Sequence, residues 1–261
     1  SHRDRIGYHL YAAIQPVLGA EGSQLMVDDK RTVMLEMREV SLNFRTRGDR
    51  FDHGIHHVLD SVSFKLYQNE TLGIIGRNGV GKTTMLRIMA GILAPTSGHV
   101  IRNPDALASL LTIGLGHQGD LSGRDNALLS AMLQGATKRE ALGFLEDIKA
   151  FSELGDSYEE PVKTYSTGMR ARLGFTTAML THVDILLVDE VLSVGDAEFR
   201  KKAQEAMKQR ISGEQTVVFV SHAANQVKNL CDRVLWLDNG KICAQGDPES
   251  VIAEYQASMK R

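Results

Sequence analysis

A glycine-rich stretch that ends in a lysine and a threonine has the residue types needed to bind phosphate groups. It runs from Gly76 to Thr83, between an apolar run and a stretch with helical spacing. Glycines let backbone N–H groups curl around a phosphate, and the N-terminus of the next helix adds partial positive charge. Lys82 is predicted to reach the β- and γ-phosphates of a nucleotide and to be catalytic, and Thr83 to ligate Mg²⁺. The predicted nucleotide-binding residues here are Gly76, Asn78, Gly79, Gly81, Lys82, Thr83 and Thr84.

Two carboxylates, Asp189 and Glu190, follow the apolar run at residues 185–188. This run is predicted to be a strand that lies beside the strand entering the glycine-rich stretch. Asp189 would then bind Mg²⁺, directly or through water, while Glu190 would orient and deprotonate the attacking water. The alternative, in which the two residues only cap the next helix, is disfavoured by the presence of the glycine-rich stretch.

His222 follows the next apolar strand, at residues 217–220, after Ser221. A histidine at a strand end is usually structural, but one strand after the acid pair it is predicted to hold the γ-phosphate and Glu190 in register. The predicted catalytic residues are therefore Lys82, Glu190 and His222. A second group, His53, His56 and His57, lacks suitably spaced partners apart from Asp52 and is interpreted as a solvated loop.

The stretch Tyr165-Ser166-Thr167-Gly168-Met169 has no evident use in the chain's own site. It resembles the signature motif of ATP-binding cassette (ABC) proteins, whose common form is Leu-Ser-Gly-Gly-Gln. Ser166 and Gly168 are kept, and the form with the other three residues is similar to that of ATPase subunits that export bacterial surface polysaccharides. The resemblance covers about residues 34–256, with blocks similar to the Q-loop region, to the Walker B motif with its D-loop, and to the cassette tail at 114–126, 189–196 and 231–248.

The resemblance implies roles for five further residues. Gln118 would be the Q-loop glutamine that touches Mg²⁺ and the membrane subunit. Phe44 would stack on adenine, although a place in the core remains an open alternative. Asp196 would cross a dimer interface, and Ser166 and Gly168 would contact the γ-phosphate bound by the opposite chain. The implied small molecules are ATP and Mg²⁺, and the implied metal ligands are Thr83, Gln118 and Asp189.

The same resemblance implies an ATPase that works only as a pair. Two copies would pack head to tail around two ATP molecules, and two membrane-spanning permease subunits would receive the motion at the cytoplasmic face of the bacterial inner membrane. The implied cargo is a lipid-linked polysaccharide: O-antigen, capsule or teichoic acid. Because the sequence leaves no room for a C-terminal carbohydrate-binding domain, we expect substrate choice to lie mainly elsewhere. The alternatives are a subunit of a small-molecule or drug exporter, a soluble cassette ATPase, and a monomeric kinase-like ATPase.

Composition excludes several other classes of protein. The 261 residues carry 30 Lys and Arg against 32 Asp and Glu, a formal net charge of −2. This balance gives no basic footprint for nucleic acid. No stretch approaches the ~20 apolar residues of a membrane span, and the N-terminus lacks the pattern of a secretion signal. The two cysteines are too few for a disulfide framework and are predicted to be buried, small apolar side chains.

Strands and helices alternate along most of the chain, which predicts an α/β fold with a mainly parallel sheet. The resemblance makes this a RecA-like P-loop NTPase core with a small antiparallel β layer and an inserted α-helical subdomain at about residues 119–180. Residues 1–33 are expected to be an N-terminal extension, either a short amphipathic helix or a loosely packed segment, and 34–258 the ABC ATPase domain. Strands are predicted at 33–44, 58–66, 71–75, 185–188, 216–220, 234–237 and 241–244, a loop at 45–57, a hairpin turn at 239–240, and helices at 81–90, 127–133, 138–151, 166–180, 197–211 and 225–231.

Overall fold

The structure is a computed structural model of the chain. It describes residues 31–45, 55–111, 117–189, 195–211, 213–221 and 224–259. All of these belong to Arg31–Arg261, one of the two units into which the chain divides. The predicted N-terminal helix and two predicted catalytic residues, Glu190 and His222, lie outside the described residues.

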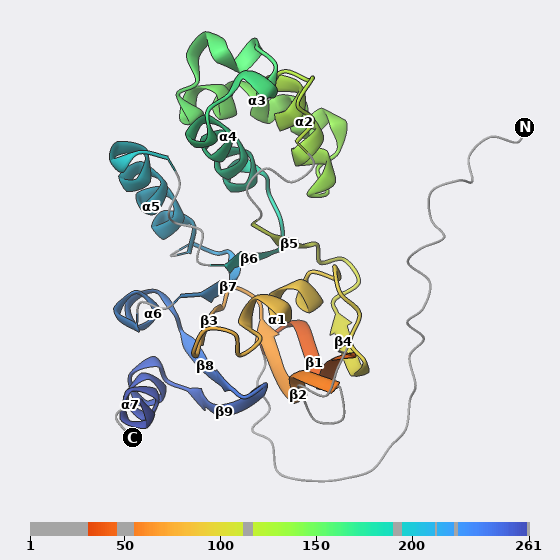
Figure 1. Cartoon of the computed structure of the whole chain (residues 1–261), viewed down its shortest axis with the longest axis vertical. Helices are drawn as coiled ribbons and strands as arrows, with labels where there is room; N and C mark the ends of the chain where they lie inside the picture. The colour runs from red at the N-terminus through yellow and green to blue at the C-terminus, as the bar shows by residue number, and fades with distance from the viewer. Residues whose placement is uncertain are drawn as a thin grey trace, which may run out of the picture. The chain divides into compact units, whose positions relative to one another are not determined.

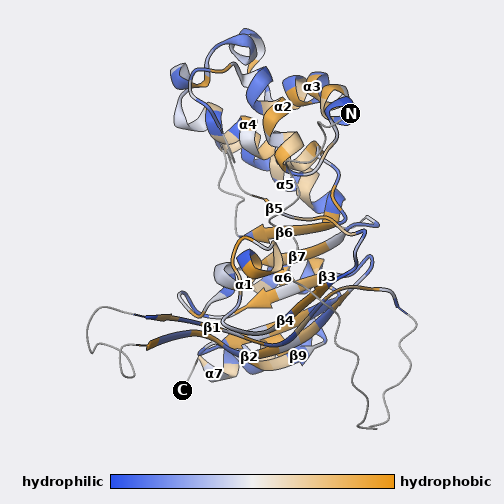
Figure 2. Cartoon of the chain, turned by 90° about the vertical axis from the view of Figure 1, so that its right-hand side faces the viewer, coloured by the Kyte–Doolittle hydropathy of each residue, from blue (hydrophilic) through white to orange (hydrophobic). Residues whose placement is uncertain are grey.

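The central element is a six-stranded sheet with the strand order β5-β6-β7-β3-β8-β9. The first five strands in this order run parallel, and β9 is antiparallel to β8. Every residue of β3 and β7 is buried, as in a parallel sheet covered on both faces, and Figure 2 shows β6 and β7 as largely hydrophobic. The strands are β3 (Thr71–Ile75), β5 (Ala108–Leu110), β6 (Ile185–Asp189), β7 (Thr216–Val220), β8 (Arg233–Asp238) and β9 (Lys241–Gly246).

Strand β7 lies between β3 and β6, so the prediction that the Asp189 strand lies directly beside the strand of the glycine-rich stretch is wrong. Ile74 of β3 pairs with Val220 of β7, and Val220 pairs with Asp189 of β6. Both β6 and β7 are short apolar runs, so the local pattern does not indicate which one borders β3. The carboxyl ends of β3 and β6 nevertheless meet at the same edge of the sheet.

A second sheet is antiparallel and has the strand order β2-β1-β4. Its strands are β1 (Val33–Arg45), β2 (Ile55–Tyr67) and β4 (Ser97–Arg102). The predicted loop at 45–57 is too long at its end, because His56 and His57 already pair with Phe44 and Asn43. Pairing with β1 outweighs the polar local composition. Strand β4 is not evident from the sequence, since its half-exposed residues include serine, glycine, histidine and arginine.

The two faces of the central sheet belong to different hydrophobic cores. On one face, Ile74 and Leu187 pack with α1 and with the antiparallel sheet; on the other, Val188 and Phe219 pack with α4, α5, α6 and α7. Successive residues of a strand point to opposite faces, so β3, β6, β7 and β8 each contribute to both cores. The helices are α1 (Lys82–Met89), α2 (Gly123–Leu133), α3 (Lys138–Ser152), α4 (Thr167–Leu180), α5 (Ala197–Ile211), α6 (Ala224–Leu230) and α7 (Pro248–Ser258).

A third core lies among α2, α3 and α4 and two short 3-10 segments, η2 (Gly155–Glu159) and η3 (Val162–Thr164) (Figure 1). Ile148, Tyr158 and Leu173 are fully buried in it. These helices fall within the stretch for which the sequence predicts an α-helical subdomain. Within the described residues, none of the helices combines the length and the apolar composition of a membrane span.

The two cysteines differ in their surroundings, and the prediction that both are buried is wrong for Cys243. Cys231 is buried in the second core, and burial, followed by the nearby charge of Asp232, raises the pKa of its thiol to about 12. Cys243 is exposed on β9, the last strand of the central sheet. One face of this terminal strand meets solvent, and the residue type alone does not reveal which face a cysteine takes.

Candidate nucleotide site

The glycine-rich stretch forms the turn between the end of β3 and the start of α1 (Figure 1). A Cβ atom on Gly76 would lie 2.2 Å from the carbonyl oxygen of Leu237, and one on Gly81 would lie 2.8 Å from that of Val58. Both glycines have positive φ, 152° and 103°, which other residues rarely adopt. A Cβ on Gly79 would meet no atom of the described residues within 4 Å. Gly76 and Gly81 therefore let the turn pack against neighbouring backbone, and Gly79 leaves the backbone of the turn open to a phosphate.

Lys82 begins α1 with its side chain folded back over the turn. It is 7% exposed, and its Nζ donates hydrogen bonds to the carbonyl oxygens of Gly76 and Arg77 at 2.8 and 2.7 Å. The N-cap glycine of α1 offers no side-chain acceptor, and the first turn holds no acidic residue. The backbone N–H groups of this turn and the Lys82 ammonium are thus donors suited to the phosphates of ATP. Thr83 and Thr84 lie in the same turn and are partly buried.

Asp189 is the last residue of β6 and is partly buried. The pairing of β6 with β7, and of β7 with β3, places it at the edge of the sheet from which the glycine-rich turn leaves. Within the described residues, no three His, Cys, Asp or Glu side chains gather as a metal site. Mg²⁺ commonly binds through one or two carboxylates together with substrate phosphates. Asp189 and the Thr83 hydroxyl fit such a site.

Ser166, predicted to reach the ATP of a second chain, caps α4. Its Oγ accepts a hydrogen bond from the N–H of Met169 at 3.1 Å, and the residue is exposed. The nearest described neighbour of a Cβ on Gly168 would be that Oγ, at 3.8 Å. Because the first turn of α4 holds no acidic residue, its N-terminus is open to an anion, as that of α1 is. Tyr165 is buried, and its hydroxyl donates to the carbonyl of Ser157, which anchors the start of α4.

Gln118 is held through its backbone by Asn126, a fully buried residue in the first turn of α2. Asn126 Oδ1 accepts the N–H of Gln118 at 2.7 Å, and its Nδ2 donates to the carbonyl of Gln118 at 3.0 Å. The same Nδ2 also donates to the carbonyls of Leu121 and Ser122. The sequence alone assigns no separate role to Asn126. A polar residue near the start of a helix is the one feature of the sequence that could have pointed to it.

Burial sets the protonation state of two residues around the site. The pKa of His117 is lowered, mainly by burial and then by the charge of Arg170 on α4, so its imidazole is neutral at pH 7. The pKa of Tyr165 is raised by burial first and by Glu159 second. Its hydroxyl therefore stays protonated and can donate to Ser157.

Comparison with known proteins decides the family. The family described as ABC transporter matches residues 59–193, just over half of the chain. This chain belongs to the ABC transporter family. The teichoic acids export ATP-binding protein TagH of Lactococcus lactis subsp. lactis is 43% identical over 199 residues, which are 76% of this chain and 42% of the relative. The O-antigen export system ATP-binding protein RfbB of Klebsiella pneumoniae is 39% identical over 202 residues, 77% of this chain and 82% of the relative.

The ABC fold is also found among solved structures. A dimeric structure of the ATP-binding cassette MJ0796, in a post-hydrolysis state bound to ADP and Pi, aligns with 82% of this chain and 99% of its own. The TM-score is 0.66 at 20% identity, a likeness that shows the fold alone. The chain spans about half the length of the first TagH relatives, 42% of the Lactococcus lactis protein and 57% of that of Shouchella clausii.

Two residues assigned from the ABC resemblance have surroundings that can be described. Phe44 is 46% exposed on β1, so the alternative that it belongs to the core is wrong. Asp196 precedes α5; its Oδ1 accepts the N–H of Phe199 at 3.0 Å, and its carboxylate forms an ion pair with Arg172 of α4. The sequence alone assigns no role to Arg172.

The predicted ABC site residues lie on three parts of the fold. Residues 76–84 and Asp189 lie at one edge of the central sheet. The helical group carries Gln118, Ser166 and Gly168, and the antiparallel sheet carries Phe44.

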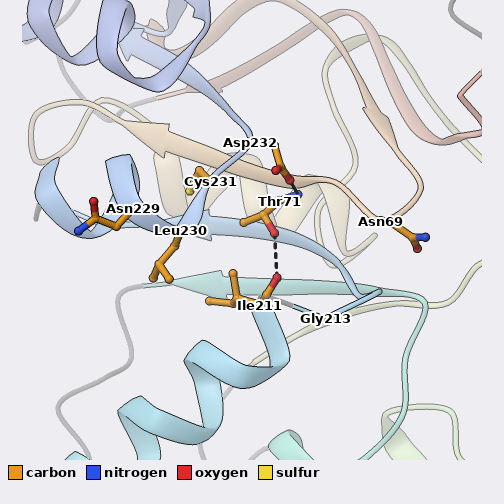
Figure 3. A pocket seen from close by; sticks show the side chains of 8 residues that line it. All are labelled: Asn69, Thr71, Ile211, Gly213, Asn229, Leu230, Cys231 and Asp232. Carbon is orange, nitrogen blue, oxygen red and sulfur yellow. Dashed lines mark hydrogen bonds between the residues drawn. The ribbon is translucent and has the colours of Figure 1, made fainter.

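A separate hollow of about 280 Å³ lies at the start of β3, between the end of α5 and the start of β8 (Figure 3). Thr71 donates its hydroxyl to the carbonyl of Ile211 at 3.3 Å and its N–H to Asp232 Oδ2 at 2.8 Å. Because Thr71 begins β3 and Gly76 follows its end, this hollow is at the opposite edge of the sheet from the candidate nucleotide turn. These hydrogen bonds join the start of β3 to the end of α5 and to the residue that precedes β8.

Proposed function

We propose that this chain is the ATP-binding and ATP-hydrolysing subunit of an ABC exporter of lipid-linked polysaccharide. The observation that carries the proposal is the turn before α1. There, an open glycine backbone, a helix N-terminus without an acidic residue and Lys82 together provide hydrogen-bond donors for phosphate groups. The cargo class is supported by relatives at 43% and 39% identity whose names state export of teichoic acids and of O-antigen.

In the proposed reaction, Lys82 and the N–H groups of α1 bind the β- and γ-phosphates, and the exposed ring of Phe44 stacks on adenine. Glu190 follows Asp189 directly in the sequence and accepts a proton from the attacking water. His222 holds the γ-phosphate and Glu190 in register. Mg²⁺ neutralises negative charge on the phosphates when it is bound. Its proposed protein ligands are Thr83, Asp189 and Gln118.

We propose that hydrolysis needs two copies of the chain. The exposed N-terminus of α4, with Ser166 and Gly168, is an anion site without an acidic residue in its first turn. In a head-to-tail pair it closes over the γ-phosphate held by Lys82 of the opposite copy, and Asp196 lies at the interface. The dimeric state stated for the solved MJ0796 cassette supports this arrangement.

Helix α2 offers a surface for a permease subunit, two of which are proposed to bind the pair at the cytoplasmic face of the inner membrane. Leu129, Met132 and Leu133 are 38%, 39% and 63% exposed. Their spacing puts them on one side of α2, and grouped exposed apolar side chains are typical of an interaction surface. The same helix holds the backbone of Gln118 through Asn126. We propose that movement of α2 is passed in this way to Gln118, a proposed Mg²⁺ ligand.

The test of the shared site is the Glu190→Gln variant. It should bind ATP and Mg²⁺ but hydrolyse ATP slowly, because the base that activates water is lost while the phosphate contacts remain. Size-exclusion chromatography with ATP should therefore show a stable dimer. As a control, the Lys82→Ala/Glu190→Gln double variant should remain monomeric. A Glu190→Gln protein that stays monomeric with saturating ATP contradicts the proposal.

The cargo is tested with the permease reconstituted in liposomes. Lipid-linked polysaccharide should stimulate ATP hydrolysis by the complex, and apolar drugs should not. Stimulation by drugs alone would instead support the small-molecule exporter.

A further inference from the structure

The antiparallel sheet bends where residues with positive φ lie at neighbouring positions on its three strands. Glu39 of β1, Ser61 of β2 and Gly98 of β4 have φ values of 48°, 53° and 80°. We call these three residues the crease. The register shifts here, because β1 has an extra residue opposite Ser63 of β2 and β2 has an extra residue opposite Ser41 of β1. Such bulges bend a strand and change the direction of the side chains beyond them.

Two serine hydroxyls bind backbone groups of the crease. A bulge leaves part of the backbone without a partner in the ladder. Ser41 Oγ accepts the N–H of Ser61 at 2.9 Å, and Ser63 Oγ accepts the N–H of Glu39 at 2.8 Å. A Cβ on Gly98 would lie 2.3 Å from the carbonyl oxygen of Glu39, so β4 also packs closely against the crease. Each of the two long strands therefore holds the positive-φ residue of the other.

The part of β2 that precedes the crease packs against the candidate nucleotide turn. A Cβ on Gly81 would lie 2.8 Å from the carbonyl oxygen of Val58, and so would one on Gly240, in the turn after β8. The N–H of Asp60 donates to the carbonyl of Gly240 at 2.9 Å. Because Val58 is only three residues before Ser61, the direction that β2 takes at the crease decides where these contacts fall.

Phe44 lies on the part of β1 that pairs with this segment of β2. Its partner is His56, which is two residues from Val58, about 7 Å along the strand. Phe44 has the exposed ring that is proposed to stack on adenine. The candidate nucleotide turn has a second support that does not involve the crease, since Gly76 packs against the carbonyl oxygen of Leu237. A change in the crease should therefore move Phe44 more than it moves the turn.

We propose that Ser41 and Ser63 are positioning residues for the base of the nucleotide, an inference that rests on the proposed function. Their hydroxyls keep the crease bent. The crease in turn holds the ring of Phe44 where a nucleotide with its phosphates in the turn places its base. Neither serine contacts the nucleotide itself. Loss of either hydroxyl leaves one backbone N–H of the crease to solvent and shifts Phe44, so contacts to the base weaken while contacts to the phosphates remain.

The experiment compares binding of ADP with binding of pyrophosphate, which has the phosphates without the base. Phe44→Ala should weaken ADP binding about tenfold, a typical loss when a base no longer stacks on an aromatic ring. Ser41→Ala and Ser63→Ala should each weaken ADP binding about fivefold. All three variants should bind pyrophosphate within about twofold of wild type. Calorimetry with Mg²⁺ present measures ADP directly and pyrophosphate by displacement of ADP.

Thr216→Val is the matched control. Thr216 Oγ1 accepts the N–H of Asn69 at 2.9 Å, a bond of the same kind, but it lies at the start of β7, the edge of the central sheet opposite the turn. This variant should match wild type for both ligands. Ser41→Thr keeps the hydroxyl and should recover most of the loss. The double variant Phe44→Ala/Ser41→Ala should lose no more ADP affinity than Phe44→Ala alone, because Ser41 acts through Phe44.

The outcomes distinguish this inference from the proposed function. A wild-type chain that binds neither ADP nor pyrophosphate removes the proposed function and the inference with it. If wild type binds both, the inference alone is overturned when Phe44→Ala keeps wild-type ADP affinity, or when Ser41→Ala and Ser63→Ala do. An equal loss for ADP and pyrophosphate, a loss shared by Thr216→Val, or additive losses in the double variant overturn it as well.

Discussion

Gly76 and Gly79 belong to the same turn but are needed for different physical reasons. A side chain on Gly76 would collide with the backbone of Leu237 whether or not a nucleotide is bound. A Cβ on Gly79 would meet none of the described residues within 4 Å, so a side chain there would occupy room that an approaching phosphate is proposed to need. The fold itself therefore requires one of these glycines, and the proposed ligand requires the other.

Alanine substitutions should separate these two requirements. Gly76→Ala should lower the free energy of unfolding by about 2–4 kcal/mol, because overpacking against the backbone adds to the strain of its positive φ. Gly79→Ala should cost about 1–2 kcal/mol, from its φ alone, but should weaken ATP binding. Denaturant unfolding and calorimetry measure the two effects. Equal losses of stability in the two variants would contradict this division.

Among the elements, those with a strong local signal could be predicted from the sequence. Strands β3 and β6 are apolar runs, and α1 and α5 show helical spacing. The three-residue strand β5 and the polar strand β4 carry no such signal. Helix α7 could have been found, because Asp247 caps it and Pro248 occupies its start, an arrangement that favours helix initiation. The position of β7 between β3 and β6 depends on long-range pairing, which no local pattern reports.

In the candidate nucleotide site, too, residues with a local sequence signal could be predicted, and those that depend on packing between elements could not. The phosphate turn and the acid at the end of β6 could be predicted because their residues are contiguous and their chemistry demands particular types. The clamp of Asn126 on Gln118 and the pair of Arg172 with Asp196 could not, because each depends on how separate elements pack. A buried amide and an arginine on a helix are common, and only their partners give them a role.

Ser166 is the N-cap residue of α4 and is also proposed to contact the partner's ATP. Thr137, the N-cap residue of α3, provides a control that separates these two roles. Ser166→Ala and Thr137→Ala each remove a side-chain oxygen that accepts a backbone N–H at the start of a helix, α4 and α3 respectively. Each should cost about 1 kcal/mol of unfolding free energy. Only Ser166→Ala should also reduce ATP turnover, since Ser166 alone is proposed to reach the partner's γ-phosphate. Equal turnover in the two variants would contradict that role.

For the whole molecule, the proposal divides each ATP site between two copies. Lys82 and the α1 turn supply one half, and the start of α4 supplies the other. The two halves lie on different packing groups of a single chain, the central sheet and the helical core. A defect in one half should therefore be complemented by a copy that is defective only in the other half.

Mixing two inactive proteins tests this directly. Lys82→Ala lacks a working phosphate turn, and Ser166→Arg blocks the start of α4, so neither protein alone should hydrolyse ATP. A mixed dimer keeps one intact site, and random pairing of equal amounts should restore at most about a quarter of wild-type activity. Steady-state ATPase assays of the mixture measure this. A mixture as inactive as its components would count against shared sites.

Strand β7 also has a consequence for how proteins of this design can diversify. Neighbouring strands are about 4.8 Å apart, so one intervening strand keeps β3 and β6 about 10 Å apart. This width is fixed by main-chain dimensions, which are the same for every sequence. Side chains along β7, all of them buried, can therefore change among residues that still pack while the spacing between the proposed phosphate turn and Asp189 stays constant.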